Sequence, residues 1–182
     1  MTDCNWPGND ALMKNYHDEE WGKPNHSDIV HFEFLILEGA QAGLSWKTIL
    51  NRRKGYQKAF DNYNWDKVAR MTESDVDRLV KDPQIIRNRL KIRSAINNSK
   101  RFIEIRKEFG SFDNYLWGFT NGKVINNEPK SLKDIPATSE LSDMISKDLK
   151  KRNFSFVGST IVYAHLQAVG IVNDHLVGCR NK

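Results

Sequence analysis

The sequence predicts an all-α fold. Apolar residues recur at helical spacing along most of the 182-residue chain, capping signals precede several of these segments, and strand signal is scant. The length suits a single domain over residues 1–182 that can bury its own core. We expect a helical core against which the terminal segments 1–26 and 171–182 pack together.

The composition argues against a membrane protein. Hydrophobic residues make up 39% of the chain, and the mean hydropathy is -0.63. No run approaches the ~18 apolar residues of a membrane-spanning helix, and the N-terminus does not resemble a signal peptide. The net charge of +5 and the pI near 9.2 give a mild bias toward polyanions. We expect a cytoplasmic monomer with no membrane partner.

The first 26 residues are irregular and hold several tryptophan, tyrosine, histidine and cysteine side chains. Residues 7–10 (PGND) predict a turn, and Ala11–Tyr16 predicts one or two helical turns. Because such a poorly periodic segment makes a weak core by itself, we expect it to lie across the rest of the domain.

The apolar run Ile29–Leu37 predicts a buried helix that begins near Ser27 and reaches Glu38. A carboxylate at the end of such a helix loses hydration, which costs several kcal/mol unless another group compensates. Two interpretations remain open. Gly39 can be a C-cap before a second core helix. Alternatively, the carboxylate, the small residues that follow it and Trp46 form a pocket for a flat, cationic or amino-bearing ligand.

Further helices are expected in the middle of the chain, over residues 47–60, 65–71 and 72–82. The last of these opens with a capping box, TESD, at 72–75. Asp82-Pro83 then stops it, and a long amphipathic helix is expected to start near Ile85 and run toward Gly110.

The two helices around Asp82 form a helix-hairpin-helix candidate. Backbone N–H groups at the start of the second helix could meet a phosphate. Basic side chains would add positive charge there, from Arg87, Arg89, Lys91 and Arg93. A plain helical hairpin is an open alternative, because Pro83-Gln84 stands where the common DNA-binding version has a glycine-rich turn.

The C-terminal half continues the helical pattern. Asn121-Gly122 predicts a turn, and residues 123–139 predict a connecting loop. Phe112-Asp113-Asn114 is interpreted as a helix cap. Two more helices are expected, an amphipathic one around residues 141–149 and an apolar one over 160–169 that is closed by Gly170.

Two cysteines and two histidines near the chain ends form a candidate metal site. Cys4-x12-His17 and His175-x3-Cys179 supply the ligand types of a tetrahedral structural zinc. Neither spacing matches a common zinc finger, so a chance cysteine at position 4 and a surface histidine at position 175 remain open alternatives. Packing or surface roles are expected for the other histidines, His26, His31 and His165.

Several of these stretches together resemble the bacterial 3-methyladenine DNA glycosylase I family of the helix-hairpin-helix superfamily. The match covers nearly the whole chain. Its motifs are CxW at 4–6, YHDxEWG at 16–22, LEGxQAGLSW at 37–46, IIRxRxKI at 85–92, FVGST at 156–160 and VNDHxxxC at 172–179. The resemblance implies an all-α glycosylase domain with its hairpin near residues 73–108 and with a zinc site that joins the two chain ends.

The resemblance also implies roles for individual residues. One structural Zn²⁺ per chain would be bound at the family's ligand positions, Cys4, His17, His175 and Cys179. Glu38, the implied catalytic residue, and Tyr16 would hydrogen-bond the edge of an extruded base. Trp46 would stack on the face of that base, with Trp6 and Trp21 in the surrounding wall.

For DNA, the resemblance implies that Gly43 and Leu44 fill the gap left in the duplex. The hairpin would hold the backbone through Ile86, Arg87, Arg89 and Lys91. The partner would be alkylated double-stranded DNA, and free 3-methyladenine would be the product ligand.

The implied reaction is monofunctional hydrolysis of the N-glycosidic bond of 3-methyladenine after base flipping. N3-methylation puts a positive charge on adenine, so the base leaves neutral without needing a proton. That fits a chain without the aspartate that many members of the superfamily place after the hairpin turn. Asp113 is the nearest downstream candidate.

Three other functions are considered. The main alternative is a zinc-containing module that binds damaged DNA without turnover. A glycosylase with lyase activity needs a lysine nucleophile, but residues 38–46 contain none, and Lys47 has no matching motif role. A small-molecule purine hydrolase is disfavoured by the hairpin and the basic helices.

Overall fold

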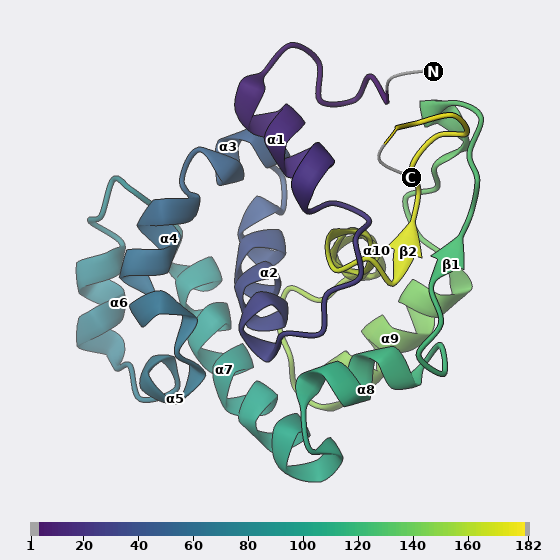
Figure 1. Ribbon diagram of the computed structural model, residues 1–182. Helices are drawn as coiled ribbons and strands as arrows, with labels where there is room; N and C mark the ends of the chain where they lie inside the picture. The colour runs from purple at the N-terminus through teal and green to yellow at the C-terminus, as the bar shows by residue number, and fades with distance from the viewer. Residues whose placement is uncertain (1–3, 181–182) are drawn as a thin grey trace.

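Helix α2 (Asp28–Gln41) runs through the centre of the computed structural model, which describes residues 4–180. Nine of its fourteen residues are buried, because apolar side chains cover most of its circumference. Helices α7 (Arg89–Phe109), α8 (Phe112–Gly118) and α10 (Ser159–Ala168) pack around it (Figure 1). The mostly helical fold that the sequence predicts is confirmed.

The remaining elements have from two to twelve residues each. In chain order they are α1 (Ala11–Glu19), α3 (Trp46–Leu50), α4 (Arg53–Ala59), η1 (Asp61–Tyr63), α5 (Trp65–Val68), α6 (Glu73–Leu79), β1 (Ile125–Asn126), η2 (Leu132–Asp134), α9 (Glu140–Lys151) and β2 (Val172–Asn173). In the described part of the chain, no helix is both long enough and apolar enough to span a membrane.

Helix α2 continues one turn beyond the predicted end, as far as Gln41. Gly39 is therefore inside the helix, and its interpretation as a C-cap is wrong. Its backbone packs closely on Phe156, whose Cβ would lie 3.6 Å from a Cβ at position 39. The extra turn places Glu38 on a rigid helical backbone rather than in a loop.

The helix predicted over residues 47–60 is two helices, α3 and α4, with a break at Asn51 and Arg52. The Asn51 side chain donates to the carbonyl of Lys47 (2.9 Å), which offers the backbone a local alternative to a continuous helix. Gly55 then allows α4 to touch the loop beyond α6, since a Cβ at this position would lie 2.3 Å from the Gln84 carbonyl oxygen.

The connection between α6 and α7 spans residues 80–88. The predicted capping box at Thr72 and Asp75 is confirmed, but α7 begins at Arg89, four residues after the predicted start. The delay has a local cause: the Asp82 carboxylate accepts from the Gln84 N–H (2.8 Å), and Asn88 caps the helix by accepting from the Lys91 N–H (3.1 Å).

One small parallel sheet was not predicted from the sequence. Strand β1 lies in the predicted connecting loop 123–139 and pairs with β2, with Ile125 opposite Val172. Two residues are too few for an alternating pattern to be recognised. The predicted turn just before β1 is confirmed, because Asn121 (φ 52°) and Gly122 (φ 71°) are both left-handed.

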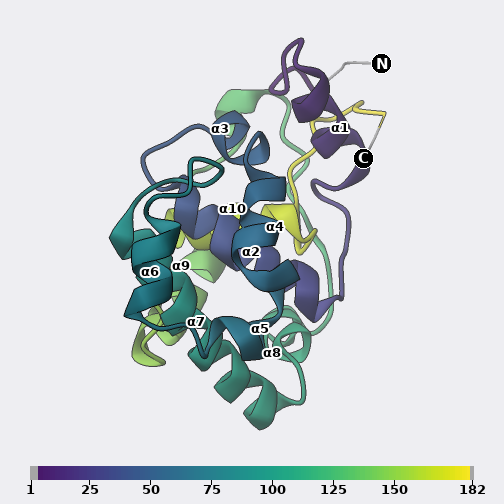
Figure 2. The same ribbon diagram turned by 90° about the vertical axis from the view of Figure 1, so that its left-hand side faces the viewer.

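The described parts of the N-terminal and C-terminal segments lie side by side in both views (Figures 1 and 2). The ring of His175 donates to the carbonyl of Trp21 (2.9 Å). The predicted closure of α10 at Gly170 (φ 71°) is also confirmed, and a Cβ there would lie 2.1 Å from the carbonyl carbon of Lys23. Glycine at this position therefore lets α10 pack directly on the N-terminal segment.

Candidate active site

A cavity of about 340 Å³ lies where α1, α2, α3 and α10 meet. It is lined by all five residues whose base-binding roles are predicted from the sequence: Trp6, Tyr16, Trp21, Glu38 and Trp46. Five further residues complete the lining: Gln41, Leu132, Ile135, Ala164 and Gln167. Side chains from distant parts of the sequence therefore converge on one pocket.

The lining residues Leu132, Ile135 and Gln167 were not predicted from the sequence. Leu132 and Ile135 come from η2 and its C-cap, within the segment predicted as a connecting loop. Gln167 was detectable as a polar residue inside the apolar run 160–169. Its side-chain amide donates to the Asp174 carboxylate (2.7 Å), which fixes the amide at the cavity wall.

Four aromatic side chains line the cavity. Trp6 meets Tyr16 and Trp21 edge-on, with ring centroids 6.3 and 5.1 Å apart. The ring of Trp46 lies 5.3 Å from that of Tyr16 and is stacked on Phe34 at 6.2 Å. Packing on several sides restricts these rings, so the cavity has a preformed shape suited to a flat ligand.

Glu38 is the one carboxyl among the described residues that line the cavity. It is only 3% exposed, and its Oε2 atom has no hydrogen-bond partner within the protein. Burial raises the pKa of Glu38 to about 8, because the low-polarity surroundings disfavour the charged form. A cation bound in the cavity would favour the ionised carboxylate.

Tyr16 supplies the second polar group of the pocket. Burial, together with the negative charges of Glu38 and Glu20, raises the pKa of Tyr16 well above its ordinary value. The phenol therefore stays neutral and can donate a hydrogen bond. A buried carboxyl, a neutral hydroxyl and stacked rings can bind a flat heterocycle that carries positive charge.

The segment between α2 and α3 borders a second cavity, of about 180 Å³. The two cavities share Glu38, Gln41 and Ala164. A Cβ added to Gly43 (φ 76°) would meet no other atom within 4 Å, and Leu44 is 40% exposed. The two residues predicted to fill a gap in duplex DNA therefore line a cavity that adjoins the main pocket.

The four hairpin residues predicted to hold DNA lie in different surroundings. Arg87 is exposed. Arg89, also exposed, is paired with Asp77 (2.6 Å). The Ile86 N–H donates to the Tyr56 hydroxyl (3.1 Å), and Lys91 points inward onto backbone carbonyls. Their DNA contacts remain predictions, and Arg87 has the most accessible charge.

The four predicted metal ligands, Cys4, His17, His175 and Cys179, are all buried, with their ligand atoms within 4.8 Å of one another. The alternative of a surface histidine at position 175 is therefore wrong, and no disulfide joins the two cysteines.

Neighbouring acceptors orient the two imidazole rings of this cluster. His17 donates through Nδ1 to the Asp18 carboxylate (2.7 Å), and His175 donates through Nε2 to the carbonyl of Trp21 (2.9 Å). These bonds leave His17 Nε2 and His175 Nδ1 facing the sulfur of Cys179, at 3.9 and 3.5 Å. Such outer hydrogen bonds are typical of histidines that bind a metal, so the cluster could hold one.

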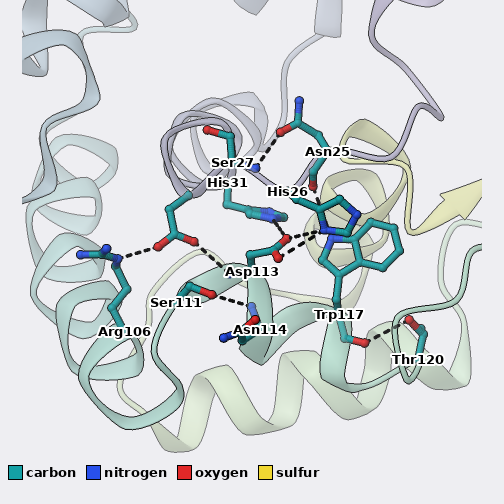
Figure 3. Close-up of polar contacts among 11 residues, drawn as sticks. Asn25, His26, Ser27, His31, Arg106, Ser111, Asp113, Asn114, Trp117 and Thr120 are labelled. Carbon is teal, nitrogen blue, oxygen red and sulfur yellow. Dashed lines mark hydrogen bonds and ion pairs between the residues drawn. The ribbon is translucent and has the colours of Figure 1, made fainter.

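Asp113 is not among the residues that line the cavity. Figure 3 shows its carboxylate between two imidazoles, accepting from His26 Nδ1 (3.0 Å) and His31 Nε2 (3.1 Å). The helix-cap interpretation is also wrong for Asp113, because Ser111 caps α8 by accepting from the Asn114 N–H (2.9 Å). Asp113 instead ties the start of α8 to α2 and to the preceding segment.

The other histidines without metal roles differ from one another. His26 is exposed, whereas His31 and His165 are buried and stacked, with ring centroids 5.8 Å apart. Burial lowers the pKa of both His31 and His165, to about 3 for His165. These two are neutral packing groups at physiological pH, and His26 lies at the surface, which are the roles predicted from the sequence.

Comparison with known proteins adds a family and several relatives. A family model described as methyladenine glycosylase matches residues 6–182. The chain is 44% identical to DNA-3-methyladenine glycosylase 1 of Escherichia coli (strain K12), over 98% of this chain and 96% of the relative.

Two solved structures are also similar. The Y16F variant of a 3-methyladenine DNA glycosylase I in complex with 3-methyladenine is 35% identical, with a TM-score of 0.97 and coverage of 100% of this chain and 98% of that chain. The E38Q variant of the enzyme from Staphylococcus aureus is 35% identical, with a TM-score of 0.96 and the same coverage.

Proposed function

The chain belongs to the methyladenine glycosylase family, and on this premise we propose that it removes 3-methyladenine from alkylated double-stranded DNA. The reaction is hydrolysis of the N-glycosidic bond, the first step of base excision repair. The observation that carries the proposal is the pocket itself, where one buried carboxyl stands among aromatic rings.

The damaged base must leave the duplex to reach this pocket, at a cost of a few kcal/mol. Leu44 fills the space that the base vacates, since it is exposed and lines the cavity that adjoins the pocket. Stacking on Trp46 and a hydrogen bond from Tyr16 then position the ring. Trp46 also offers its electron-rich face to the positive charge of the methylated base.

Glu38 acts by charge. The free protein holds this carboxyl largely protonated at neutral pH, because burial raises its pKa to about 8. The cationic base displaces that proton, and the resulting carboxylate hydrogen-bonds the base and stabilises the positive charge that develops on the sugar. Water attacks C1′, the C1′–N9 electron pair goes to the base, the water proton passes to solvent, and neutral 3-methyladenine leaves.

The buried Cys2His2 cluster holds one structural Zn²⁺ in this proposal. Two thiolates and two oriented imidazoles suit a closed tetrahedral site. The metal would tie α1, and with it Tyr16, to the C-terminal segment. It takes no part in the reaction.

Helices α6 and α7 form the DNA-binding hairpin in this proposal. The long connection 80–88 is anchored by the buried side chain of Ile85, and it presents Arg87 to solvent. Ile86, Arg87 and Arg89 would contact the backbone. In this proposal the protein acts in the cytoplasm and as a monomer, and the monomer is supported by a pocket lined by described residues of a single chain.

Base release is the direct test of this function. We expect incubation with methylated duplex DNA to release 3-methyladenine and to leave 7-methylguanine and unmodified adenine largely bound. Unmodified adenine carries no positive charge for the Glu38 carboxylate to attract, and it would leave as an anion rather than as a neutral base. Chromatography of the released bases measures the result.

Two outcomes of that assay would contradict the proposal. Release of mainly 7-methylguanine would mean that the pocket selects another lesion. Tight binding of methylated DNA with no base release would favour the alternative function, a damage-binding module.

We also expect a monofunctional reaction. No lysine lines the cavity in the part of the chain that the structure describes. The Lys47 ammonium is paired with Asp10 (2.7 Å), and that of Lys91 is bound to two backbone carbonyls. Borohydride added during turnover should therefore trap no covalent adduct with DNA. An efficiently trapped adduct would show that an enzyme amine attacks the sugar.

A further inference from the structure

Lys91 makes a contact that the predicted role in DNA binding does not explain. Its Nζ atom donates to the carbonyl oxygen of Ala40 (2.8 Å) and to that of Ala42 (2.6 Å). No carboxylate lies within ion-pair distance of this ammonium among residues 4–180, and burial lowers the pKa of Lys91. Two of its three donors are thus committed to the protein backbone.

The two carbonyls belong to the end of α2, where such groups have no partner inside the helix. Helix α2 has no basic residue in its last turn, and its C-cap residue is Ala42 (φ -42°, ψ 115°), which the left-handed Gly43 (φ 76°) follows. The carbonyl of Gln41 is satisfied locally by the Leu44 N–H (2.6 Å). Lys91, about fifty residues further along the chain, supplies the missing donors and the positive charge that favours a helix C-terminus.

The two bonds of Lys91 lie between Glu38 and the Gly43–Leu44 loop in the sequence. Glu38 lies three residues before Gln41, the end of the helix, and Gly43 and Leu44 follow Ala42. A Cβ added at Gly43 would meet no other atom within 4 Å. Besides the turn bond from the Leu44 N–H to the Gln41 carbonyl, the loop is held by the Lys91 ammonium, which fixes the helix end at Ala40 and the C-cap residue Ala42.

We propose that Lys91 is a positioning residue that caps α2 and fixes the Gly43–Leu44 loop against the start of α7, rather than a phosphate contact. The hairpin and the loop are thereby held at a fixed separation. In the part that concerns DNA this inference rests on the proposed function, because a correctly placed Leu44 is needed to hold the base extruded.

Three variants test the inference. Lys91→Met keeps the length of the side chain and removes every donor. Lys91→Arg keeps a cation with several donors. Arg87→Met is the matched control, because it removes an exposed cation from the connection next to Lys91. A melting curve accompanies each variant, and Lys91→Gln replaces Lys91→Met if that protein does not fold.

The first measurement needs no DNA. We expect hydrogen exchange in residues 41–46 to speed up by about tenfold in Lys91→Met, to be near wild type in Lys91→Arg, and to be unchanged in Arg87→Met. Unchanged exchange in Lys91→Met would overturn the inference. Because no turnover is involved, this result stands even if the wild-type protein releases no 3-methyladenine.

The second measurement separates positioning from phosphate contact. Removing a phosphate contact should lower the slope of log K against log salt by about 0.9. We expect that loss in Arg87→Met, at a predicted backbone contact, and not in Lys91→Met, in which single-turnover excision at saturating enzyme should instead fall by about tenfold. A lowered salt slope with normal excision in Lys91→Met would assign Lys91 to the DNA backbone and overturn the proposal.

Discussion

Glu38→Gln should slow the release of 3-methyladenine by more than about tenfold, which corresponds to ~1.4 kcal/mol of transition-state stabilisation. Glutamine keeps the shape of the side chain and much of its hydrogen bonding, so the substitution isolates the charge. The relevant measurement is single-turnover excision at saturating enzyme, since loss of the charge also weakens binding of the cationic base.

The pH dependence of excision should also depend on Glu38. Burial raises the pKa of Glu38 to about 8, and the ionised form is the one that attracts a cationic base. We therefore expect kcat/KM for excision to rise as the pH increases toward about 8 and then to level off, because this ratio reports on the free enzyme. The profile of Glu38→Gln should lack that rise.

Stability should change with pH in the opposite direction. The folded-state pKa of Glu38 lies above its unfolded value of 4.5, so folding favours the protonated carboxyl. Its contribution to stability is complete below pH 4.5 and declines as the pH rises through about 8. Glu38→Gln should thus melt close to wild type at acidic pH and above it at pH values beyond about 8.

Excision at the wild-type rate by Glu38→Gln, with a matching pH profile, would show that the charge of Glu38 has no part in catalysis. Melting curves of the wild type and of Glu38→Gln show whether a change in excision rate is caused by a loss of folded protein. The E38Q variant of the Staphylococcus aureus relative has a solved structure, so that protein accommodates the substitution.

Cys179→Ser is the second substitution with a large expected effect. Cys179 lies in the buried cluster together with Cys4, His17 and His175, and loss of one thiolate should weaken zinc binding and its contribution to folding. We expect the bound zinc to fall from one per chain to a small fraction. The melting temperature should fall by about 10 °C, the scale of about 3 kcal/mol in a domain of this size.

Cys4→Ser is the matched control, because it removes the other sulfur from the same site. If the cluster acts as one unit, the double variant should be little less stable than either single variant. Metal analysis that finds no zinc in wild-type protein from a zinc-replete culture would refute the zinc assignment. If the protein contains no zinc and the stability losses of the two single variants add up in the double variant, the two sulfurs act as packing groups.

The sequence was most informative where distinctive motifs carry the resemblance to a known family. Trp6, Tyr16, Trp21, Glu38 and Trp46 were all expected in one pocket, and they meet there. Helix ends marked by a strong local signal, such as the capping box at Thr72, were also located correctly. In each case the information lies within a few neighbouring residues or in a distinctive motif.

Features that hydrophobic periodicity does not record were predicted poorly. The break at Asn51, the late start of α7 and the short β1–β2 pair all depend on contacts or local hydrogen bonds that periodicity does not record. Lys91 is the clearest example. Its basic neighbours indicated a DNA-facing cation, but its inward direction depends on the end of α2, about fifty residues earlier.

The cluster that joins the two terminal segments also has a consequence for the order of folding during synthesis. Cys4 and His175 are separated by 171 positions, so the N-terminal half of the cluster emerges from the ribosome long before its counterpart. A domain folds as a unit, so the contacts between α1 and the C-terminal segment form only after residues 175–179 have appeared. A nascent chain that stops before His175 would carry the residues that line the pocket, but not the contacts that join the two terminal segments. Those contacts are therefore among the last to form in this domain.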